Sequence, residues 1–233
     1  MITVQMEGED YKEFLASVIK FNRCNTIVEI GVQFGFATQY FCEAAKFHNG
    51  FVYGYDIFDR HGLLKQHPGF ATMEDVNNRL LDLKLTNFKL TKVDTYSEEF
   101  RKIIKQDTVS NIDFAFIDAC HSYKGIKNDF DVVYPLLSAV GIVAFHDTSN
   151  IDGCREFMID LRTKYYDGTY DVVDFPWGFF GRRCGVSLLV KRSYPVLKFP
   201  IIEVCNLEDT RETILEKEQL WYDSEVAHAY LRK

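Results

Sequence analysis

Two pairs of acidic and histidine residues are the groups in this chain best suited to chemistry. Asp118 and His121 occur in the stretch IDFAFIDACHSYKG, and His146 and Asp147 occur in GIVAFHDTS. Each pair directly follows an apolar run typical of a buried strand. Carboxylate and imidazole groups placed together can act as a general base or supply oxygen and nitrogen ligands to a divalent metal. A structural role for the histidines is the alternative, and the presence of two such pairs weighs against it.

A second candidate site lies in the stretch TIVEIGVQFGFATQYF, residues 26–41, where an apolar run gives way to a helix-compatible sequence. Gly31 and Gly35 would let the backbone turn tightly and approach a ligand without a Cβ in the way. Their spacing differs from the G-x-G-x-x-G fingerprint of dinucleotide-binding sites. Glu29, two residues before Gly31, suits a cationic ligand group better than a phosphate. The alternative is a tight turn in which the glycines are incidental.

Acidic residues also follow the next two apolar runs. Asp56 ends the sequence YGYD, at a position where a carboxylate can accept hydrogen bonds from ribose hydroxyls. The alternative for Asp56 is a solvated turn residue. In KVDTYSEEF, Asp94 and Ser97 either line the same crevice or cap the following helix. Capping is the better interpretation for Ser97, because Glu98 and Glu99 follow it.

The elements that must position these groups are predicted from the alternation of apolar runs with segments of helical period. Runs rich in β-branched and aromatic residues predict strands over 26–30, 51–55, 87–93, 112–117, 140–145, 170–174 and 185–190. Strands that alternate with helices predict a doubly wound α/β fold with a mostly parallel sheet. The last two strands, with only a loop between them, predict a closing antiparallel hairpin. Such sheets bind ligands at the carboxyl ends of their strands, where the candidate residues lie.

Three helices are expected, the first over 9–21. The second has apolar residues at 73, 76, 80 and 83 and opens with a capping box formed by Thr72 and Asp75. The third has apolar residues at 123, 126, 130, 133 and 137, and Pro135 is expected to kink or end it. We expect residues 1–205 to form one domain. The charged, helix-prone residues 206–233 would add a helical appendage that packs on the core or on a second subunit, as in a homodimer.

Composition narrows the class of protein. A formal net charge of −7 argues against a nucleic-acid partner, because phosphate binding needs a clustered basic surface. The six cysteines contain no C-x-x-C pair and no zinc-like grouping. We see no secretory signal and no apolar run approaching the roughly 18 residues of a membrane helix. We therefore expect a cytoplasmic protein with reduced thiols and no membrane partner.

Taken together, the segments VEIGVQFGFAT, YGYD and FIDACHSYKGIKNDFDVVYPLLSAVGIVAFHD resemble the class I S-adenosylmethionine-dependent methyltransferases. The resemblance covers residues 26–190. It is most specific in the D-x-x-H-x-Y segment followed by a strand ending in His-Asp, a pattern of the small-molecule O-methyltransferase branch. It implies a seven-stranded Rossmann-like methyltransferase sheet. It also implies that S-adenosylmethionine binds across the ends of the first, second and fourth strands.

The resemblance also implies roles for individual residues. Glu29, Gly31 and Gly35 would flank the methionine moiety, and Asp56 would hold the ribose. The full cofactor-binding set that we expect is Glu29, Gly31, Gln33, Gly35, Asp56, Asp94 and Asp118. The expected catalytic set is His121 as the base together with Asp118, His146 and Asp147.

A divalent metal such as Mg²⁺ is a further expectation from the resemblance. Asp118 and Asp147 match positions that bind a divalent ion in metal-dependent relatives. Those relatives often carry two adjacent oxygen ligands after the fifth strand, and here His146 takes one of the two places. If no ion binds, the two carboxylates would instead orient His121.

The expected function is therefore S-adenosylmethionine-dependent methyl transfer to a hydroxyl group of a small molecule, such as a sugar or a natural product. The alternative is a non-catalytic protein that binds S-adenosylmethionine or a nucleotide. A nucleotide-dependent oxidoreductase is disfavoured by the absence of G-x-G-x-x-G, and a metal-dependent hydrolase is a further outsider. Two segments rich in histidine, aromatic and arginine residues are expected to contact the acceptor, namely 57–70 and 174–185. The alternative is that they are ordinary surface loops.

Overall fold

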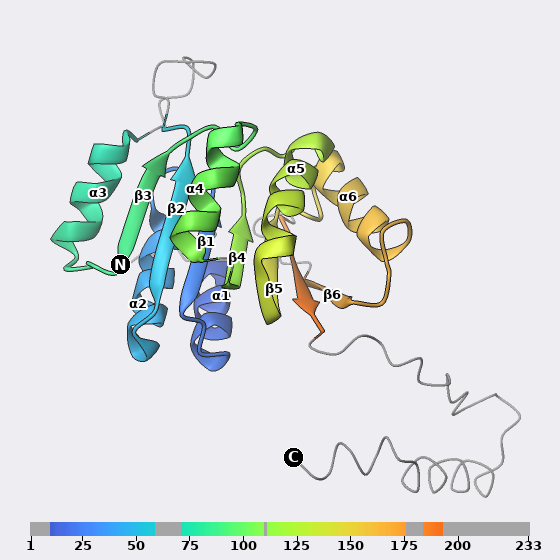
Figure 1. Ribbon diagram of the computed structural model, residues 1–233, viewed down its shortest axis with the longest axis horizontal. Coiled ribbons are helices and arrows are strands. Elements are labelled where there is room, and N and C mark those ends of the chain that lie inside the picture. Colours follow the sequence, from blue (N-terminus) through green and yellow to red (C-terminus); the bar gives the residue numbers. More distant parts are fainter. Residues whose placement is uncertain (1–9, 59–70, 110, 176–183, 193–233) are drawn as a thin grey trace, which may run out of the picture. The chain divides into compact units, whose positions relative to one another are not determined.

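Strands and helices alternate along the chain, as the computed structural model shows (Figure 1). It describes residues 10–58, 71–109, 111–175 and 184–192. The helices are α1 (Asp10–Phe21), α2 (Phe36–Ala45), α3 (Met73–Asp82), α4 (Glu98–Thr108), α5 (Tyr123–Val133) and α6 (Asp152–Arg162). The strands are β1 (Thr26–Ile30), β2 (Phe51–Asp56), β3 (Phe88–Lys92), β4 (Ile112–Ile117), β5 (Leu137–His146), β6 (Tyr170–Phe175) and β7 (Val186–Lys191).

The strands form one seven-stranded sheet in the order β3-β2-β1-β4-β5-β7-β6. The first five strands pair in parallel, whereas β7 runs antiparallel between β5 and β6. This arrangement confirms the predicted doubly wound sheet and the closing hairpin. The strand order reverses between β1 and β4, and the crevice at such a reversal is where open α/β sheets bind ligands.

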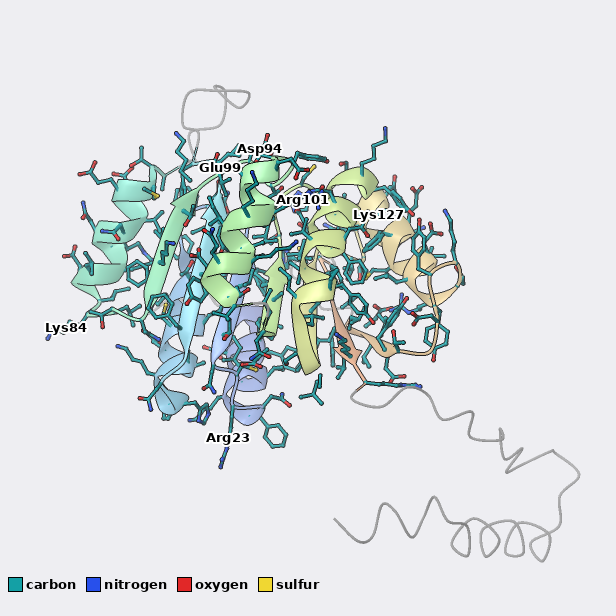
Figure 2. The ribbon with its side chains drawn as sticks, in the orientation of Figure 1. Arg23, Lys84, Asp94, Glu99, Arg101 and Lys127 are labelled. Atoms are coloured by element: carbon teal, nitrogen blue, oxygen red, sulfur yellow. The ribbon has the colours of Figure 1, made fainter. Side chains whose placement is uncertain are left out.

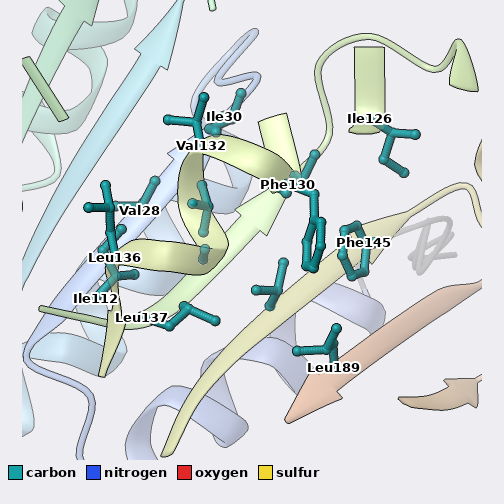
Figure 3. Close-up of a cluster of buried hydrophobic side chains, with 14 of the residues drawn as sticks. Val28, Ile30, Ile112, Ile126, Phe130, Val132, Leu136, Leu137, Phe145 and Leu189 are labelled. Carbon is teal, nitrogen blue, oxygen red and sulfur yellow. The ribbon is translucent and has the colours of Figure 1, made fainter. Parts of the chain in front are cut away.

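Apolar side chains cover both faces of the sheet. Helices α1, α2 and α3 pack on one face, in a core that contains Phe41 and Phe116. Helices α4, α5 and α6 pack on the other face, in a core that contains Phe130 and Phe145 (Figures 1 and 3). Because both faces are covered, the central strands need apolar residues at nearly every position, which explains the continuous apolar runs in β4 and β5.

Strand β5 departs from the prediction. It begins at Leu137, three residues before the expected start, and its pairing with β4 shifts register between Ile112 and Phe114. Leu137 was expected to extend the apolar face of the preceding helix, and this expectation is wrong. Helix α5 ends at Val133, and a 3₁₀ turn that contains Pro135 follows it. Proline lacks the N–H that a continuing helix needs, so it ends the helix as predicted and releases Leu137 to pair with β4.

The predicted helix caps are present. Thr72 and Asp75 form the capping box of α3, and the Ser97 hydroxyl accepts a hydrogen bond from the Phe100 N–H at the start of α4. The Ser122 hydroxyl caps α5 in the same way, by accepting from the Gly125 N–H. These caps fix where the chain leaves the loops that carry the candidate residues.

Several predictions concern segments outside the described residues. They are the appendage over 206–233, most of the segment 57–70, and residues 176–183 of the second acceptor segment. These remain predictions. Among the described residues, the helices are all too short or too polar to cross a membrane.

Candidate active site

The ends of β4 and β5 bring together the four residues predicted to be catalytic. Asp118 follows β4, His146 is the last residue of β5, and Asp147 is the next residue. His121 Nε2 lies 3.2 Å from Asp118 Oδ1 and 3.1 Å from Asp147 Oδ2. His146 Nδ1 lies 3.2 and 3.3 Å from the same two oxygens. Two carboxylate oxygens and two imidazole nitrogens therefore alternate around one small space.

The four groups shift each other's proton affinity. Hydrogen bonding to Asp118 and Asp147 raises the pKa of His121 to about 10. Burial opposes protonation of His146, but the same two carboxylates outweigh it and raise the pKa of His146 to about 9. Burial alone would raise the pKa of Asp118 and Asp147, yet the imidazoles hold both pKa values below the usual range. The carboxylates thus favour the protonated form of both imidazoles, and the imidazoles favour the ionised form of both carboxylates.

The two histidines differ in their surroundings. The His121 side chain is 39% exposed, and its Nε2 makes a hydrogen bond to Asp118. The His146 side chain is only 13% exposed. Its Nδ1 is buried and has no hydrogen bond of acceptable direction, despite the nearby carboxylate oxygens. Asp147 has a φ of 57°, in the left-handed region that residues other than glycine rarely adopt. Such backbone strain is typical of functional sites.

Helix α6 supports the loop that carries His121. A Cβ at Gly153 would lie 2.6 Å from the His121 carbonyl oxygen and 2.5 Å from the Tyr123 nitrogen, so only glycine allows this close approach. The Cys154 thiol, in the same turn of α6, lies 3.6 Å from the same carbonyl oxygen as a weak donor. The sequence offered no sign of this contact, because Gly153 is an ordinary residue of its own helix.

Tyr11 of α1 is a further residue of the cluster that sequence reasoning missed. Its ring lies 4.4 Å from the His146 ring and 6.1 Å from the Phe116 ring, centroid to centroid. Burial, followed by the charges of Asp118, Glu29 and Asp147, raises the pKa of the Tyr11 phenol above its usual value. The phenol therefore keeps its proton. An N-terminal helix was predicted, but no local pattern indicates which distant group such a tyrosine contacts.

At the other side of the crevice, Asp56 joins two loops. Its Oδ2 accepts a hydrogen bond of 2.9 Å from the Gln33 N–H, and its Oδ1 accepts one of 2.8 Å from the Phe58 N–H. An ionised carboxylate offers about four acceptor positions, so two of these remain for a ligand. Gln33 and Asp56, both predicted to contact the cofactor, are thus direct neighbours.

The glycine turn is shaped by packing within the chain. A Cβ at Gly31 would lie 2.3 Å from the Asp118 carbonyl oxygen, so this glycine is required where the ends of β1 and β4 touch. Gly35 is the N-cap residue of α2. The Arg79 guanidinium of α3, a residue not anticipated from the sequence, donates to the Phe34 and Gly35 carbonyl oxygens. Gly31 is therefore needed for packing as well, and its predicted role in admitting a ligand stays a prediction.

Glu29 and Asp94 differ in their surroundings. Glu29 is 1% exposed and accepts a hydrogen bond of 2.5 Å from the Thr38 hydroxyl. Burial raises the pKa of Glu29 to about 8. Asp94 is exposed, accepts a hydrogen bond from the Tyr96 N–H, and takes part in the turn before α4. Figure 2 places Asp94 with Glu99 at the end of the sheet towards which the parallel strands point, opposite Arg23.

Comparison with known proteins decides the family. The sequence profile described as "Methyltransferase domain" matches residues 28–148, a range that runs from β1 to just past Asp147. The chain belongs to this methyltransferase family. All four residues of the Asp/His cluster, together with Glu29 and Asp56, lie inside the matched region.

One curated protein is a distant relative of this methyltransferase. A curated protein of Sinorhizobium fredii, the uncharacterized protein y4gI, is 29% identical over 126 residues, which are 54% of this chain and 13% of that protein. The chain thus spans only a small part of that relative's length.

Solved structures share the fold of this methyltransferase. One is the O-methyltransferase TomG from Streptomyces achromogenes, involved in tomaymycin synthesis and crystallised with S-adenosylmethionine. It is 14% identical with a TM-score of 0.62, over 78% of this chain and 79% of TomG. Another is the O-methyltransferase from Bacillus cereus in complex with S-adenosylhomocysteine. It is 14% identical with a TM-score of 0.64, over 81% of this chain and 84% of that chain. At these identities the likeness is one of fold.

Proposed function

We propose that this methyltransferase uses S-adenosylmethionine to methylate a hydroxyl group of a small molecule. The observation that carries the proposal is the cluster of Asp118, His121, His146 and Asp147. It lies at the ends of strands β4 and β5, beside the crevice where the strand order reverses. A protein that only binds the cofactor has no need of such a cluster. The crystallised O-methyltransferases of the same fold support the proposal.

The cofactor would occupy the crevice between the glycine turn and Asp56. The two unused acceptor positions of Asp56 suit the ribose hydroxyls. Gly31 and the backbone of Asp118 touch, so the turn and the catalytic cluster border the same space. Glu29, Gln33, Gly35 and Asp94 complete the proposed set. When bound, S-adenosylmethionine supplies an electrophilic methyl group on a sulfonium.

The chain's contribution to the reaction is to position the acceptor and remove its proton. Bound S-adenosylmethionine would supply the methyl group and keep the electron pair of its carbon–sulfur bond, and the acceptor would give up its hydroxyl proton to a base of the chain. Only the neutral form of His121 can act as the base. In that form Nε2, which faces the carboxylates of Asp118 and Asp147, would keep its proton, and Nδ1 would accept the hydroxyl proton. Alignment of the three reacting atoms supplies much of the rate, and a positioned base adds on the order of 10²–10⁴-fold.

The remaining partners are part of the same proposal. The acceptor is a small molecule, with contacts from the segments 57–70 and 174–185. We also propose a cytoplasmic location and a homodimer in which residues 206–233 contribute to the interface.

The test separates binding from chemistry. We would measure S-adenosylhomocysteine release with pools of sugars, phenols and other hydroxyl compounds, and S-adenosylhomocysteine affinity by calorimetry. His121→Ala should keep the affinity and lose turnover by about 100-fold or more, whereas His48→Ala, a distant histidine, should change neither. Asp56→Asn should weaken S-adenosylhomocysteine binding, because the amide NH₂ of asparagine would face a backbone N–H and both are donors. The matched control is Asp82→Asn, at an exposed position.

Two results would overturn the proposal. Tight binding of S-adenosylhomocysteine without turnover on any pool would favour the non-catalytic alternative. Absence of S-adenosylhomocysteine binding, with fluorescence changes on adding NADH, would favour a nucleotide-dependent protein.

A further inference from the structure

The turn between β1 and α2, residues 31–35, has an unusual backbone. Gly31 and Gly35 have φ values of 93° and 71°, and Gln33, which is not a glycine, has a φ of 50°. A residue other than glycine adopts this left-handed conformation at an energetic cost, so it persists only where the surrounding structure holds it. The Gly35 N–H donates a hydrogen bond of 2.8 Å to the Val32 carbonyl oxygen within the turn. Contacts from other elements are needed to hold the rest.

Two charged side chains from other elements bind the backbone of this turn. Asp56, at the end of β2, accepts a hydrogen bond of 2.9 Å from the Gln33 N–H. Arg79, in the last turn of α3, donates hydrogen bonds of 3.3 and 3.0 Å to the Phe34 and Gly35 carbonyl oxygens. Hydrogen bonds with one charged partner are about twice as strong as neutral ones. The turn is thus clamped by a carboxylate at its N–H group and by a guanidinium at its carbonyl groups.

The guanidinium of Arg79 is itself oriented by α2. Its Nη2 donates a hydrogen bond of 2.7 Å to the side-chain oxygen of Gln39, and the group lies 4.5 Å from the centre of the Phe36 ring. All three oxygens that accept from Arg79 are neutral. The planar fork of arginine can bind several acceptors in a fixed geometry, whereas the ammonium of lysine is a single point of charge. Arg79 therefore joins α3 to the turn and to α2 in one defined arrangement.

Close packing supports the same arrangement. A Cβ on Gly35 would lie 2.6 Å from Val76 Cγ1 and 3.7 Å from Arg79 Nη1. Val76 and Arg79 are three positions apart, so they lie on one face of α3. Val76 is buried and Arg79 is half-buried. Helix α3 therefore packs directly against the turn.

We propose that Arg79 is a positioning residue for S-adenosylmethionine, because its guanidinium holds the 31–35 turn in the conformation that receives the cofactor. This inference rests on the proposed function, in which the turn borders the cofactor crevice. Nη1 and Nη2 donate to the turn and to α2, so Arg79 acts through the backbone and does not touch the cofactor. Without Arg79 the turn would adopt its present conformation only part of the time, and the apparent affinity for the cofactor would fall by that fraction.

The experiment compares full-length variants with the wild type, below their melting temperatures. Arg79→Met keeps a long apolar stem but has no donor groups. Calorimetry should show that it binds S-adenosylhomocysteine at least about tenfold more weakly, which corresponds to the loss of one hydrogen bond to a charged group. The KM for S-adenosylmethionine should rise while kcat on the acceptor pools stays near the wild-type value. Lys105→Met, at an exposed position of α4, also removes one positive charge and is the matched control.

A second variant tests how Arg79 acts. Gln39→Ala removes one acceptor of the guanidinium and should weaken S-adenosylhomocysteine binding by a smaller factor than Arg79→Met does. Because Gln39 acts through Arg79 in this proposal, the double variant should bind no more weakly than Arg79→Met alone. Losses that multiply in the double variant would contradict the clamp.

Amide hydrogen exchange gives a readout that needs no cofactor. In Arg79→Met the N–H groups of residues 31–39 should exchange faster, whereas those of β4 and β5 should exchange as in the wild type. A merely structural role for Arg79 would lower the melting temperature and leave both the affinity and the local exchange of the folded protein unchanged.

The outcomes separate this inference from the proposed function. Unchanged S-adenosylhomocysteine affinity in Arg79→Met, with a wild type that binds, would overturn the inference and leave the proposed function standing. No binding to the wild type would overturn the proposed function and, with it, the cofactor role of Arg79. If Arg79→Met does not fold, Arg79→Lys takes its place. A single ammonium cannot bind both carbonyl oxygens and Gln39 in the same geometry, so Arg79→Lys should still weaken binding, and wild-type affinity in this variant would overturn the inference.

Discussion

Replacing Glu29 with glutamine removes a buried carboxyl group that the folded chain holds mostly uncharged. The group is 1% exposed and accepts one hydrogen bond, from the Thr38 hydroxyl. Burial raises its pKa from 4.5 to about 8. The unfolded chain therefore loses this proton at a lower pH than the folded chain does. As the pH rises from 4.5 towards 8, unfolding is increasingly favoured.

The size of the effect comes from the shift itself. One pKa unit corresponds to about 1.4 kcal/mol, so the site lowers the free energy of unfolding by about 3 kcal/mol between pH 5 and pH 8. Glutamine has nearly the same shape and can still accept the hydrogen bond from Thr38, but it does not titrate. Glu29→Gln should therefore remove this part of the pH dependence and leave the contributions of all other groups.

The assay is urea unfolding of both proteins at pH 5 and pH 8. The wild type should lose about 3 kcal/mol more than Glu29→Gln over this interval, and the two should differ least at pH 5. Parallel pH dependences would refute the reasoning, because they would mean that Glu29 is ionised in the folded chain near its ordinary pKa. If the carboxylate receives a cationic group of the cofactor, saturating S-adenosylhomocysteine should also reduce the difference.

Three further predictions concern the Asp/His cluster. The pKa of His121 is raised to about 10, so the fraction of His121 in its neutral, basic form increases with pH. The kcat of the metal-free enzyme should therefore rise about tenfold per pH unit from pH 7 to 9. A flat pH profile would exclude His121 as the base. Tyr11→Leu should lower kcat at least tenfold, whereas Tyr11→Phe, which keeps the ring, should retain most of the wild-type kcat. An equal loss of kcat in both variants would exclude a role for the Tyr11 ring in packing against His146. Gly153→Ala should lower kcat with unchanged S-adenosylhomocysteine affinity, because the new Cβ displaces the His121 backbone. Ile159→Ala, at an exposed position of the same helix, is the matched control. Full activity of Gly153→Ala would refute the idea that α6 supports the His121 loop.

Much of the fold could be predicted because its signals are local. The bounds of β4, Ile112–Ile117, were predicted without error from its apolar run. A strand covered on both faces is apolar at nearly every position, and Asp113 is the exception in β4. The caps at Thr72 and Ser97 were readable because each depends on residues within one turn. The start of β5 could not be predicted in this way, because Leu137 pairs with Ile112 of the neighbouring strand across a shift in register.

The sequence by itself determined which groups are available for chemistry and at which strand ends they emerge. Asp118, His121, His146 and Asp147 were identifiable because each lies at the end of a buried strand or within a few residues after it. Their grouping was expected from the general rule for parallel sheets, without any distance.

Only the tertiary structure decided how those groups meet and what state they are in. Tyr11 reaches His146 across 135 positions of the chain, and Gly153 supports His121 from a different helix. The raised pKa of Glu29 and the placement of the His146 nitrogen beside two carboxylates both depend on contacts made on folding. The physical reason is that desolvation and donor geometry arise from atoms brought together by folding, and residues adjacent in the chain do not encode them.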